Sequence, residues 1–288
     1  MNDHQKRDKF RALLNGARCV YPASVFDPVS ALTAEELGFD VGLLGGSIAS
    51  MSVLAAPDVY ALTLSELAEQ VRRISRVGNI PLLVDGDHGY GNALSVMRTI
   101  EELAAAGAAA VMIEDTLLPP PFGQSGTDTL TSIEEGAGRM RAAVAASRDS
   151  GIVILARTGA AGLSGVADAI ARCKAYAATG VDGIFLNGFR SVEDFKAITE
   201  TIDLPLVVDP TIKEVRNIDL LNAAGVKIAL QGHQAFTAAA IAIYDVLKAL
   251  RDGADPTDVV DPRSAETIKR INRAALYTNH AKAFMGRD

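Results

Sequence analysis

The chain has 288 residues, 49% of them hydrophobic, and a formal net charge of −7. This length and apolar content fit one large α/β domain with a full core and leave no room for long disorder. The negative charge argues against nonspecific nucleic-acid binding, and no apolar stretch approaches the roughly 20 residues of a membrane-spanning helix.

Two cysteines, Cys19 and Cys173, stand far apart in the sequence. Their number and spacing exclude a disulfide framework and a zinc finger. They are typical of buried thiols in a reducing compartment, and the polar residues 1–10 do not read as a secretory signal. We therefore expect a cytoplasmic protein with no membrane segment.

A strand–helix unit repeats along the chain. Residues 6–15 are predicted to form a helix that precedes the fold proper, as a lid or an entry helix. After it, short apolar strands alternate with amphipathic helices. The predicted strands are 19–21, 41–44, 81–84, 109–113, 152–156, 184–186, 206–208 and 227–230. The predicted helices lie at 28–37, around 64–74 and 96–103, after a capping box at 132–135, and at 166–179 and 234–250.

Eight such repeats predict an α/β fold of the (β/α)8, or TIM, barrel type over residues 1–253. A doubly wound open sheet is the alternative, and the lack of a G-x-G-x-x-G motif after the first strand weakens it. Residues 254–288 are predicted to form a helical tail, with a helix pair at 268–284, that packs on the barrel or on a neighbouring subunit. The long loop at 117–127 is predicted to be a functional lid.

The segment 82–87 places two carboxylates, Asp85 and Asp87, directly after an apolar strand. We expect Asp85 at the carboxyl end of this strand, where α/β barrels bind ligands. Two carboxylates this close repel each other unless they share a cation, and hard oxygen ligands suit Mg²⁺ or Mn²⁺. The alternative is an acidic turn that caps the next helix.

Polar side chains follow most of the other predicted strands. The whole set is Ser47, Asp85, Asp87, Glu114, Asp115, Arg157, Asn187, Asp209 and His233. Because a parallel barrel brings all strand ends to one face, we expect these residues in one pocket. There Arg157 can clamp a carboxylate with two hydrogen bonds, and the predicted Gly-Gly-Ser turn at 45–47 can present backbone N–H groups to an anion.

Each of these residues also has a simpler interpretation. Glu114 and Asp115 could cap a helix, and Arg157 could belong to a structural ion pair. His233 could be a core histidine, which is the commoner role of a lone histidine, and His88 is interpreted as structural. These simpler interpretations would all have to hold at matching positions of one repeat, and this requirement favours the pocket.

Four motifs, at 44–47, 85–91, 113–115 and 156–158, together resemble the isocitrate lyase / phosphoenolpyruvate mutase superfamily over about residues 10–251. Segments 24–28, 55–58, 115–119 and 232–233 are most similar to its oxaloacetate decarboxylase branch. The resemblance implies a (β/α)8 barrel, often with its last helix exchanged between subunits of a homotetramer arranged as a dimer of dimers. It also implies Mg²⁺ and a small 2-oxo dicarboxylate as the substrate.

The resemblance assigns a role to each matching position. It implies that Asp85 ligates the metal directly and that Asp87 and Glu114 hold metal-bound waters. Substrate contacts are implied for the segment Gly46-Ser47 and for Arg157 and His233. The expected activity is decarboxylation of oxaloacetate, or a close 2-oxo diacid, through a metal-stabilised enolate, with Asp85, Arg157 and His233 as catalytic residues.

The sequence departs from the superfamily at three places. The loop at 117–126 contains neither the cysteine of the superfamily's lyases nor the Lys and Asn of its mutase and phosphonopyruvate hydrolase branches. Gly159 stands where the decarboxylase branch is expected to have a polar residue, and Asp209-Pro210-Thr211 where a tyrosine is expected. Two alternatives therefore stay open: a C–C lyase for a malate- or methylisocitrate-like 2-hydroxy diacid, and a barrel that binds a 2-oxo acid without turnover.

Overall fold

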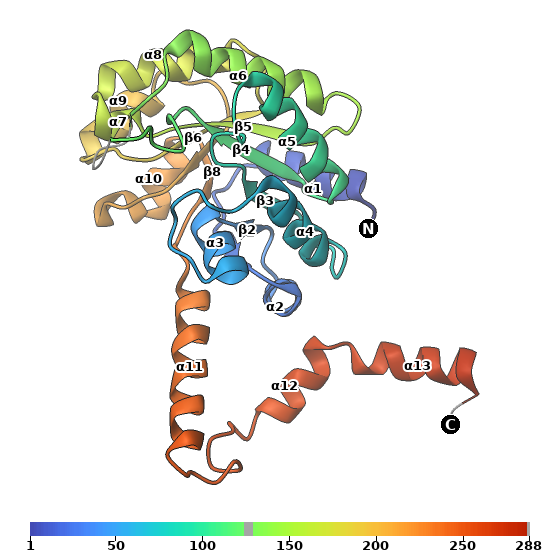
Figure 1. Ribbon diagram of the computed structural model, residues 1–288. Helices are drawn as coiled ribbons and strands as arrows, with labels where there is room; N and C mark the ends of the chain where they lie inside the picture. Colours follow the sequence, from blue (N-terminus) through green and yellow to red (C-terminus); the bar gives the residue numbers. More distant parts are fainter. Residues whose placement is uncertain (124–128, 287–288) are drawn as a thin grey trace.

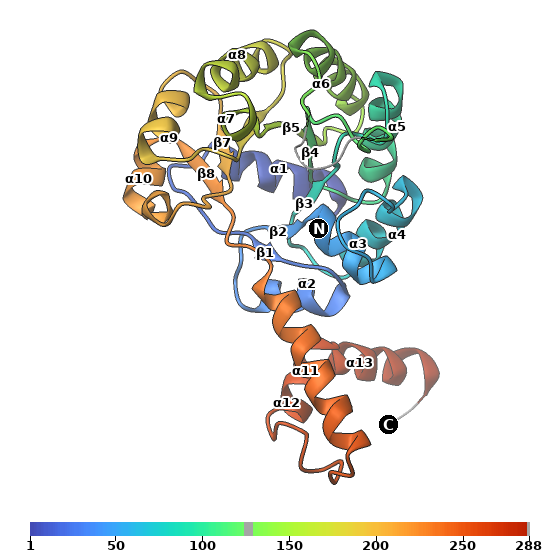
Figure 2. The same ribbon diagram turned by 60° about the vertical axis from the view of Figure 1, so that its left-hand side comes forward.

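The computed structural model describes residues 1–123 and 129–286. Its centre is one curled sheet of eight parallel strands in the order β1 to β8, which confirms the predicted α/β class and the strand count. Helices surround the outside of this sheet (Figures 1 and 2). The strands are β1 (Ala23–Ser24), β2 (Gly42–Leu44), β3 (Leu82–Asp85), β4 (Ala110–Glu114), β5 (Val153–Thr158), β6 (Gly183–Leu186), β7 (Leu206–Val208) and β8 (Val226–Ala229).

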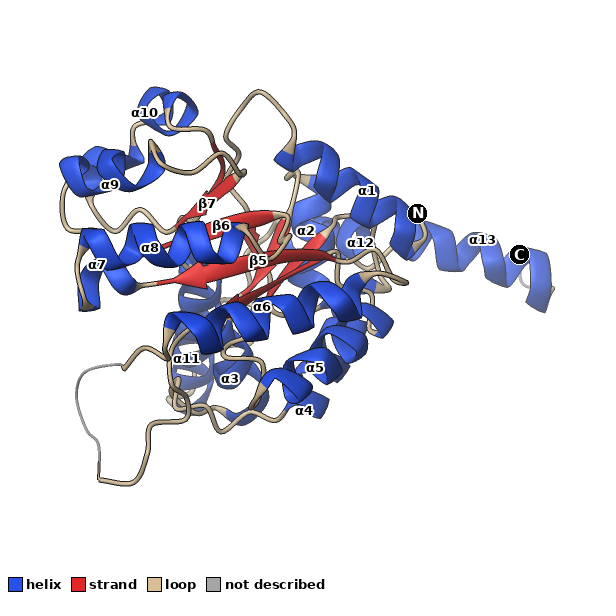
Figure 3. Cartoon of the chain, turned by 90° about the horizontal axis from the view of Figure 1, so that it is seen from above, coloured by secondary structure: helices blue, strands red, loops and turns tan. Residues whose placement is uncertain are grey.

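Many helices begin where the sequence supplies a capping residue. The side chains of Asp27, Thr63 and Ser132 each accept a hydrogen bond from the N–H three residues on. Figure 3 shows α5, α6 and α8 along the outside of the strands. The helices are α1 (Asp3–Leu14), α2 (Pro28–Glu36), α3 (Gly46–Leu54), α4 (Leu64–Ser75), α5 (Ala93–Ala105), α6 (Ile133–Ser147), α7 (Ala160–Leu163), α8 (Val166–Ala177), α9 (Val192–Thr199), α10 (Ile218–Ala223), α11 (Gln234–Arg251), α12 (Ser264–Ile271) and α13 (Ala274–Met285), with a 3-10 turn at Lys213–Arg216.

The first strand begins later in the chain than the sequence predicts. Residues 19–21 were predicted to form the strand, but β1 follows them, and Val20 makes only a parallel bridge with Ile228 of β8. The N–H of Ala229 donates to the carbonyl of Val20 at 3.0 Å. Pro22 interrupts the ladder because it has no N–H to donate. This bridge links β8 to the segment before β1 and so bends the sheet toward a closed ring.

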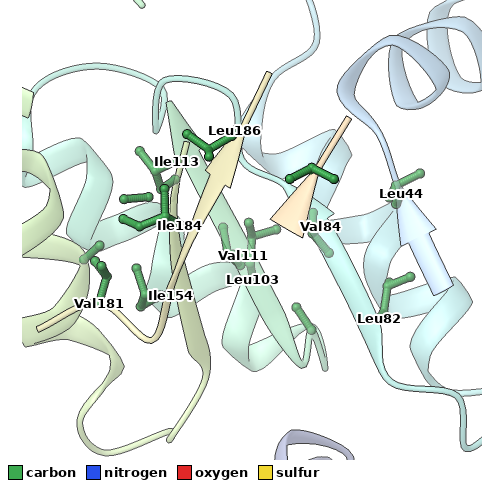
Figure 4. Packing of buried hydrophobic residues seen from close by; sticks show 14 of the residues in the cluster. Leu44, Leu82, Val84, Leu103, Val111, Ile113, Ile154, Val181, Ile184 and Leu186 are labelled. Atoms are coloured by element: carbon green, nitrogen blue, oxygen red, sulfur yellow. The ribbon is translucent and has the colours of Figure 1, made fainter. Parts of the chain in front are cut away.

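The sheet is buried on both faces. Consecutive strand residues such as Leu43 and Leu44 belong to different clusters, because side chains alternate along a strand. The inner cluster fills the barrel with Val41, Leu43, Leu83, Met112, Leu155, Phe185, Val207 and Ile228. The outer cluster packs the sheet against the helices and includes Leu44, Leu82, Val84, Ile113, Ile154, Ile184 and Leu186 (Figure 4).

The leading helix α1 closes the amino ends of the strands. Phe10 and Leu14 are fully or almost fully buried in the inner cluster. The guanidinium of Arg7 donates to the carbonyls of Ala104 at 2.6 Å and Ala108 at 3.2 Å, just before β4. The interpretation of this helix as a lid is therefore wrong, because it lies at the end of the barrel opposite the carboxyl ends of the strands.

The loop after β4 has an ordered base. Thr116 and Leu130 form an antiparallel bridge, and the N–H of Leu117 donates to the carbonyl of Thr129 at 2.7 Å. Part of the predicted lid at 117–127 lies outside the described residues, and its role stays a prediction.

The C-terminal helices extend away from the barrel (Figures 1 and 2). No residue of α11, α12 or α13 is buried, and α12 reaches α2 through an ion pair of 2.8 Å between Arg270 and Glu36. Apolar side chains of α11 are exposed, among them Ile241, Ile243, Tyr244 and Leu247. Among the described residues, no helix has the length and apolar character needed to cross a membrane.

Candidate active site

A cavity of about 270 Å³ opens at the carboxyl ends of the strands. The structure brings eight of the nine predicted strand-end residues into its wall, and they come from seven of the eight strands. They are Ser47, Asp85, Asp87, Glu114, Arg157, Asn187, Asp209 and His233. The expectation of one shared pocket therefore holds for all of them except Asp115.

Asp115 points away from the cavity. It follows Glu114, and because neighbouring side chains of a strand face opposite ways, Asp115 lies between the sheet and the outer helices. Its carboxylate is fully buried and accepts hydrogen bonds from Tyr176 at 2.7 Å, Thr158 at 2.9 Å and Arg172 at 3.0 Å. Asp115 is a structural residue that ties the ends of β4 and β5 to α8.

Arg157 is the counter-ion of the buried carboxylates. Its Nη1 donates to Asp85 Oδ2 at 2.7 Å, and its Nε lies 3.4 Å from Glu114 Oε2. The guanidinium also sits over the ring of Phe185, 5.4 Å from its centroid. Burial opposes the charge of Arg157, but the carboxylates of Asp85 and Glu114 outweigh it and raise the pKa of the guanidinium. Arg157 is therefore charged and held against the carboxylates of β3 and β4.

The backbone around Asp87 is folded tightly against β4. Asp87 has a left-handed φ of 46°, and its carbonyl accepts from the N–H of Glu114 at 2.8 Å. Burial, followed by the charges of Asp85 and Glu114, raises the pKa of Asp87. These carboxylates carry more negative charge than Arg157 alone can neutralise.

The Gly45-Gly46 segment is the start of helix α3 and not a turn, which corrects the sequence prediction. A Cβ on Gly45 would stand 2.8 Å from His233 Nε2, and a Cβ on Gly46 would stand 2.6 Å from Asp87 Oδ1. Glycine is thus required by the close approach of these two side chains. The first N–H groups of α3, including that of Ser47, have no acceptor within the helix and are available to an anion at the cavity.

His233 is held by a partner from the opposite edge of the sheet. Its Nδ1 lies 2.7 Å from Ser24 Oγ of β1, which leaves Nε2 directed at the Gly45 side of the cavity. Burial lowers the pKa of His233, so the ring is neutral at pH 7. His88 does not line the cavity, and burial lowers its pKa to about 4, in agreement with the structural interpretation of this residue.

The sequence patterns did not predict two residues of the cavity wall. Asp58 and Tyr60 line it from the connection between α3 and α4, far from any strand end. Asp58 belongs to the segment 55–58 that carried part of the family resemblance, and this was the only signal for it. The other wall residues, Leu43, Met112, Phe185 and Leu230, form the apolar floor.

The donor set is suited to a hard cation that keeps water ligands. Asp85, Asp87 and Glu114 supply only oxygen atoms. Within residues 1–123 and 129–286, no three His, Cys, Asp or Glu side chains lie close enough together to hold an ion by themselves. The free thiols Cys19 and Cys173 are buried, and neither lines the cavity.

Comparison with known proteins gives one consistent relationship. The chain is 46% identical to a protein named oxaloacetate decarboxylase from Rhodopseudomonas palustris (strain BisB18), over 99% of both chains. It matches the structure of oxaloacetate acetylhydrolase in complex with the inhibitor 3,3-difluorooxalacetate with a TM-score of 0.83 and 28% identity, over 96% of this chain and 97% of the other. It also matches the structure of phosphonopyruvate hydrolase in complex with oxalate and Mg²⁺ with a TM-score of 0.84 and 28% identity. That match covers 99% of this chain and 100% of the other.

The family model described as phosphoenolpyruvate phosphomutase matches residues 10–251, close to the whole barrel. The chain therefore belongs to the phosphoenolpyruvate phosphomutase family, as the motifs around Asp85, Glu114 and Arg157 predicted.

Proposed function

We propose that this protein converts oxaloacetate, or a closely related 2-oxo diacid, to pyruvate and CO₂. The observation that carries the proposal is the cavity itself, where Arg157, His233 and the start of α3 face the carboxylates of β3 and β4. The 46% identity to a protein named oxaloacetate decarboxylase supports the same reaction. So does the bound oxaloacetate analogue in a structural relative. The activity is that of a carboxy-lyase.

The substrate carboxylates have two binding partners in the cavity. Arg157 offers a planar guanidinium that can hold a carboxylate with two parallel hydrogen bonds. The N–H groups of Gly46 and Ser47 offer the positive end of a helix. His233, neutral and oriented by Ser24, presents Nε2 to the bound substrate.

We infer that Asp85 ligates Mg²⁺ directly and that Asp87 and Glu114 hold waters of the ion. The surplus of negative charge around Arg157 and the oxygen donor set support this assignment, and a structural relative binds Mg²⁺ with oxalate. Mg²⁺ in proteins commonly takes one or two carboxylates and keeps several waters, and Mn²⁺ accepts similar ligands. When bound, the ion would supply a Lewis acid that draws electron density from the 2-oxo group.

The chemistry asks little of the protein beyond orientation and charge. Loss of CO₂ from the β-carboxylate needs no proton abstraction, and the proton that C3 takes up afterwards need not come from a cysteine. Arg157 and the start of α3 hold the dicarboxylate in place, and His233 faces the reacting part of the molecule. A C–C lyase that depends on a thiol has no support here, because Cys19 and Cys173 lie outside the cavity.

The test is release of CO₂ and pyruvate from oxaloacetate with Mg²⁺ and again with EDTA, each corrected for the rate with metal alone. We expect enzyme-dependent production of both that chelation abolishes. Asp85→Ala should lose at least a factor of about 10²–10³ in rate, while the exposed control Asp203→Asn keeps the wild-type rate.

Two results would count against these assignments. Metal-dependent turnover of Asp85→Ala at the wild-type rate would reject Asp85 as the metal ligand. No rate above free metal in the wild-type protein would reject decarboxylation, and a screen of 2-hydroxy diacids for lyase products would follow.

We also propose that α11 and the tail 254–288 pack on a second copy of the chain, within a homotetramer. The exposed apolar residues Ile243 and Leu247 lie one helical turn apart on α11 and would be covered by such packing. The arrangement of the subunits as a dimer of dimers, and the location in the cytoplasm, are expectations from the sequence.

A further inference from the structure

Asp209 is one of two carboxylates of the cavity, the other being Asp58, to which the proposed reaction assigns no role. It follows β7, where its N–H donates to the carbonyl of Leu186 at 3.0 Å, and its side chain lines the cavity beside Asn187 and His233. Within the described residues, its carboxylate makes no hydrogen bond or ion pair with another side chain. A half-buried carboxylate without a partner is costly, so its charge needs an explanation.

The basic groups around Asp209 make their hydrogen bonds to other partners. Arg157 is paired with Asp85 at 2.7 Å, and Nδ1 of His233 is paired with Ser24. Arg216, from the turn after β7, donates to the carbonyl of Pro210 at 2.9 Å and to the carbonyl of Thr211 at 3.3 Å. These are the three basic groups that act on Asp209, and each already has its own acceptor or hydrogen-bond partner.

Burial raises the pKa of Asp209, and Arg157, His233 and Arg216 oppose this only in part. The rest of the cavity adds further negative charge. Asp58, Asp85, Asp87 and Glu114 line it as well, and Arg157 contributes the guanidinium that faces them. A divalent ion at β3 and β4 would neutralise its own ligands but not Asp209 on β7, across the barrel. An ionised Asp209 would therefore repel a dianionic substrate.

We propose that Asp209 takes up a proton when the dianionic substrate binds and delivers that proton to the substrate carbon that has lost CO₂. This inference rests on the proposed decarboxylation. The C3–C4 bond breaks and C4 leaves as CO₂, while the electron pair stays on C3 and spreads to the 2-oxo oxygen as an enolate. C3 then forms a bond to the proton of Asp209, the carbonyl is restored, and Asp209 remains as the carboxylate.

The cycle balances because each turnover consumes one proton from solvent. Departure of monoanionic pyruvate leaves Asp209 ionised, and the entry of the next dianion restores its proton. The same residue thus removes a repulsive charge during binding and acts as the general acid after the C–C bond has broken. A carboxyl group whose pKa is raised by burial, and raised further by a bound dianion, is suited to this role.

Binding of oxalate to the Mg²⁺-saturated protein tests the first half of the inference. Calorimetry in buffers of different ionisation enthalpy counts the protons taken up, and repetition from pH 6 to 9 gives the pH dependence of Kd. For the wild type we expect uptake approaching one proton per oxalate, with Kd rising about tenfold per pH unit above the pKa of Asp209 in the free enzyme. Asp209→Asn should lose the uptake and bind oxalate equally well across this range.

The timing of the two products tests the second half. In the wild type, CO₂ and keto-pyruvate should appear together. In Asp209→Asn, CO₂ should appear first, because the other product leaves as enolpyruvate, without a new proton at C3, and tautomerises to keto-pyruvate in solution. Asp209→Glu keeps an acid and should restore both the uptake and the simultaneous release, and the exposed Asp203→Asn should match the wild type throughout.

The failures of the two proposals are distinguishable. Proton uptake and simultaneous product release in Asp209→Asn, at wild-type levels, would overturn the role of Asp209 and leave decarboxylation intact. A wild-type protein that releases no CO₂ from oxaloacetate would overturn the proposed function and this inference with it.

Discussion

Removal of the Tyr176 hydroxyl should weaken the fold by an amount that the structure defines. Tyr176 and Asp115 are both fully buried, and the tyrosine supplies one of three hydrogen bonds to Asp115 Oδ2, at 2.7 Å. Tyr176→Phe keeps the ring in place and removes this bond, together with the hydrogen bond of 3.2 Å that the tyrosine hydroxyl accepts from Arg172 Nη1. A hydrogen bond to a buried charged group contributes about 1.5–3 kcal/mol, which corresponds to a fall in Tm of roughly 3–10 °C for a chain of this size.

Thermal and urea unfolding, followed by circular dichroism, measure this loss. Asp203→Asn is the control, because Asp203 is exposed and lies outside α11, and its variant should differ from wild type by less than about 0.5 kcal/mol. A double-mutant cycle with Thr158→Val, which removes the bond of 2.9 Å to the same oxygen, should give a coupling energy above about 0.5 kcal/mol. If Tyr176→Phe were as stable as Asp203→Asn, the argument that Asp115 depends on its donors would be refuted.

Two further predictions concern the helices. In α6, Gly136→Ala should destabilise the protein by about 1–3 kcal/mol, because the new Cβ would stand 2.9 Å from Cζ of the buried Tyr176. Gly138→Ala in the same helix should stabilise the protein by about 0.5–1 kcal/mol, because the nearest atom to its new Cβ is Arg141 Nη2 at 3.8 Å. Urea titrations that ranked the stabilities of these two variants in the opposite order would contradict the packing of α6. On α11, the double variant Ile243→Asp/Leu247→Asp should shift the mass measured by light scattering from tetramer to smaller species, whereas Lys248→Ala should not; an unchanged mass would reject α11 as a subunit interface.

Much of the fold and the site follows from local patterns of residues. Apolar runs that end in a polar residue placed Asp85, Arg157 and His233 at strand ends, because a charged side chain is excluded from a strand that is buried on both faces. Parallel pairing then brings those ends together whatever the details of each helix. The polar ends of strands β2 to β8 were therefore predictable before any coordinates were known.

Other features had no local signal. Glu114 and Asp115 are adjacent carboxylates, and only the pairing of Glu114 with Arg157 in the β4–β5 register decides which one faces the cavity. Gly45-Gly46 resembled a turn, and the side chains of His233 and Asp87, distant in sequence, explain why the start of a helix needs glycine there.

The order of residues along the chain thus determined the strand–helix repeat, the strand ends and the family, since each depends on neighbours a few positions apart. The tertiary structure alone decided which carboxylates share Arg157, which of them are buried without a partner, and which residues outside the strands reach the cavity, as Asp58 and Tyr60 do. These properties depend on distances between segments far apart in sequence, and the energy of a charge depends on everything that surrounds it in space.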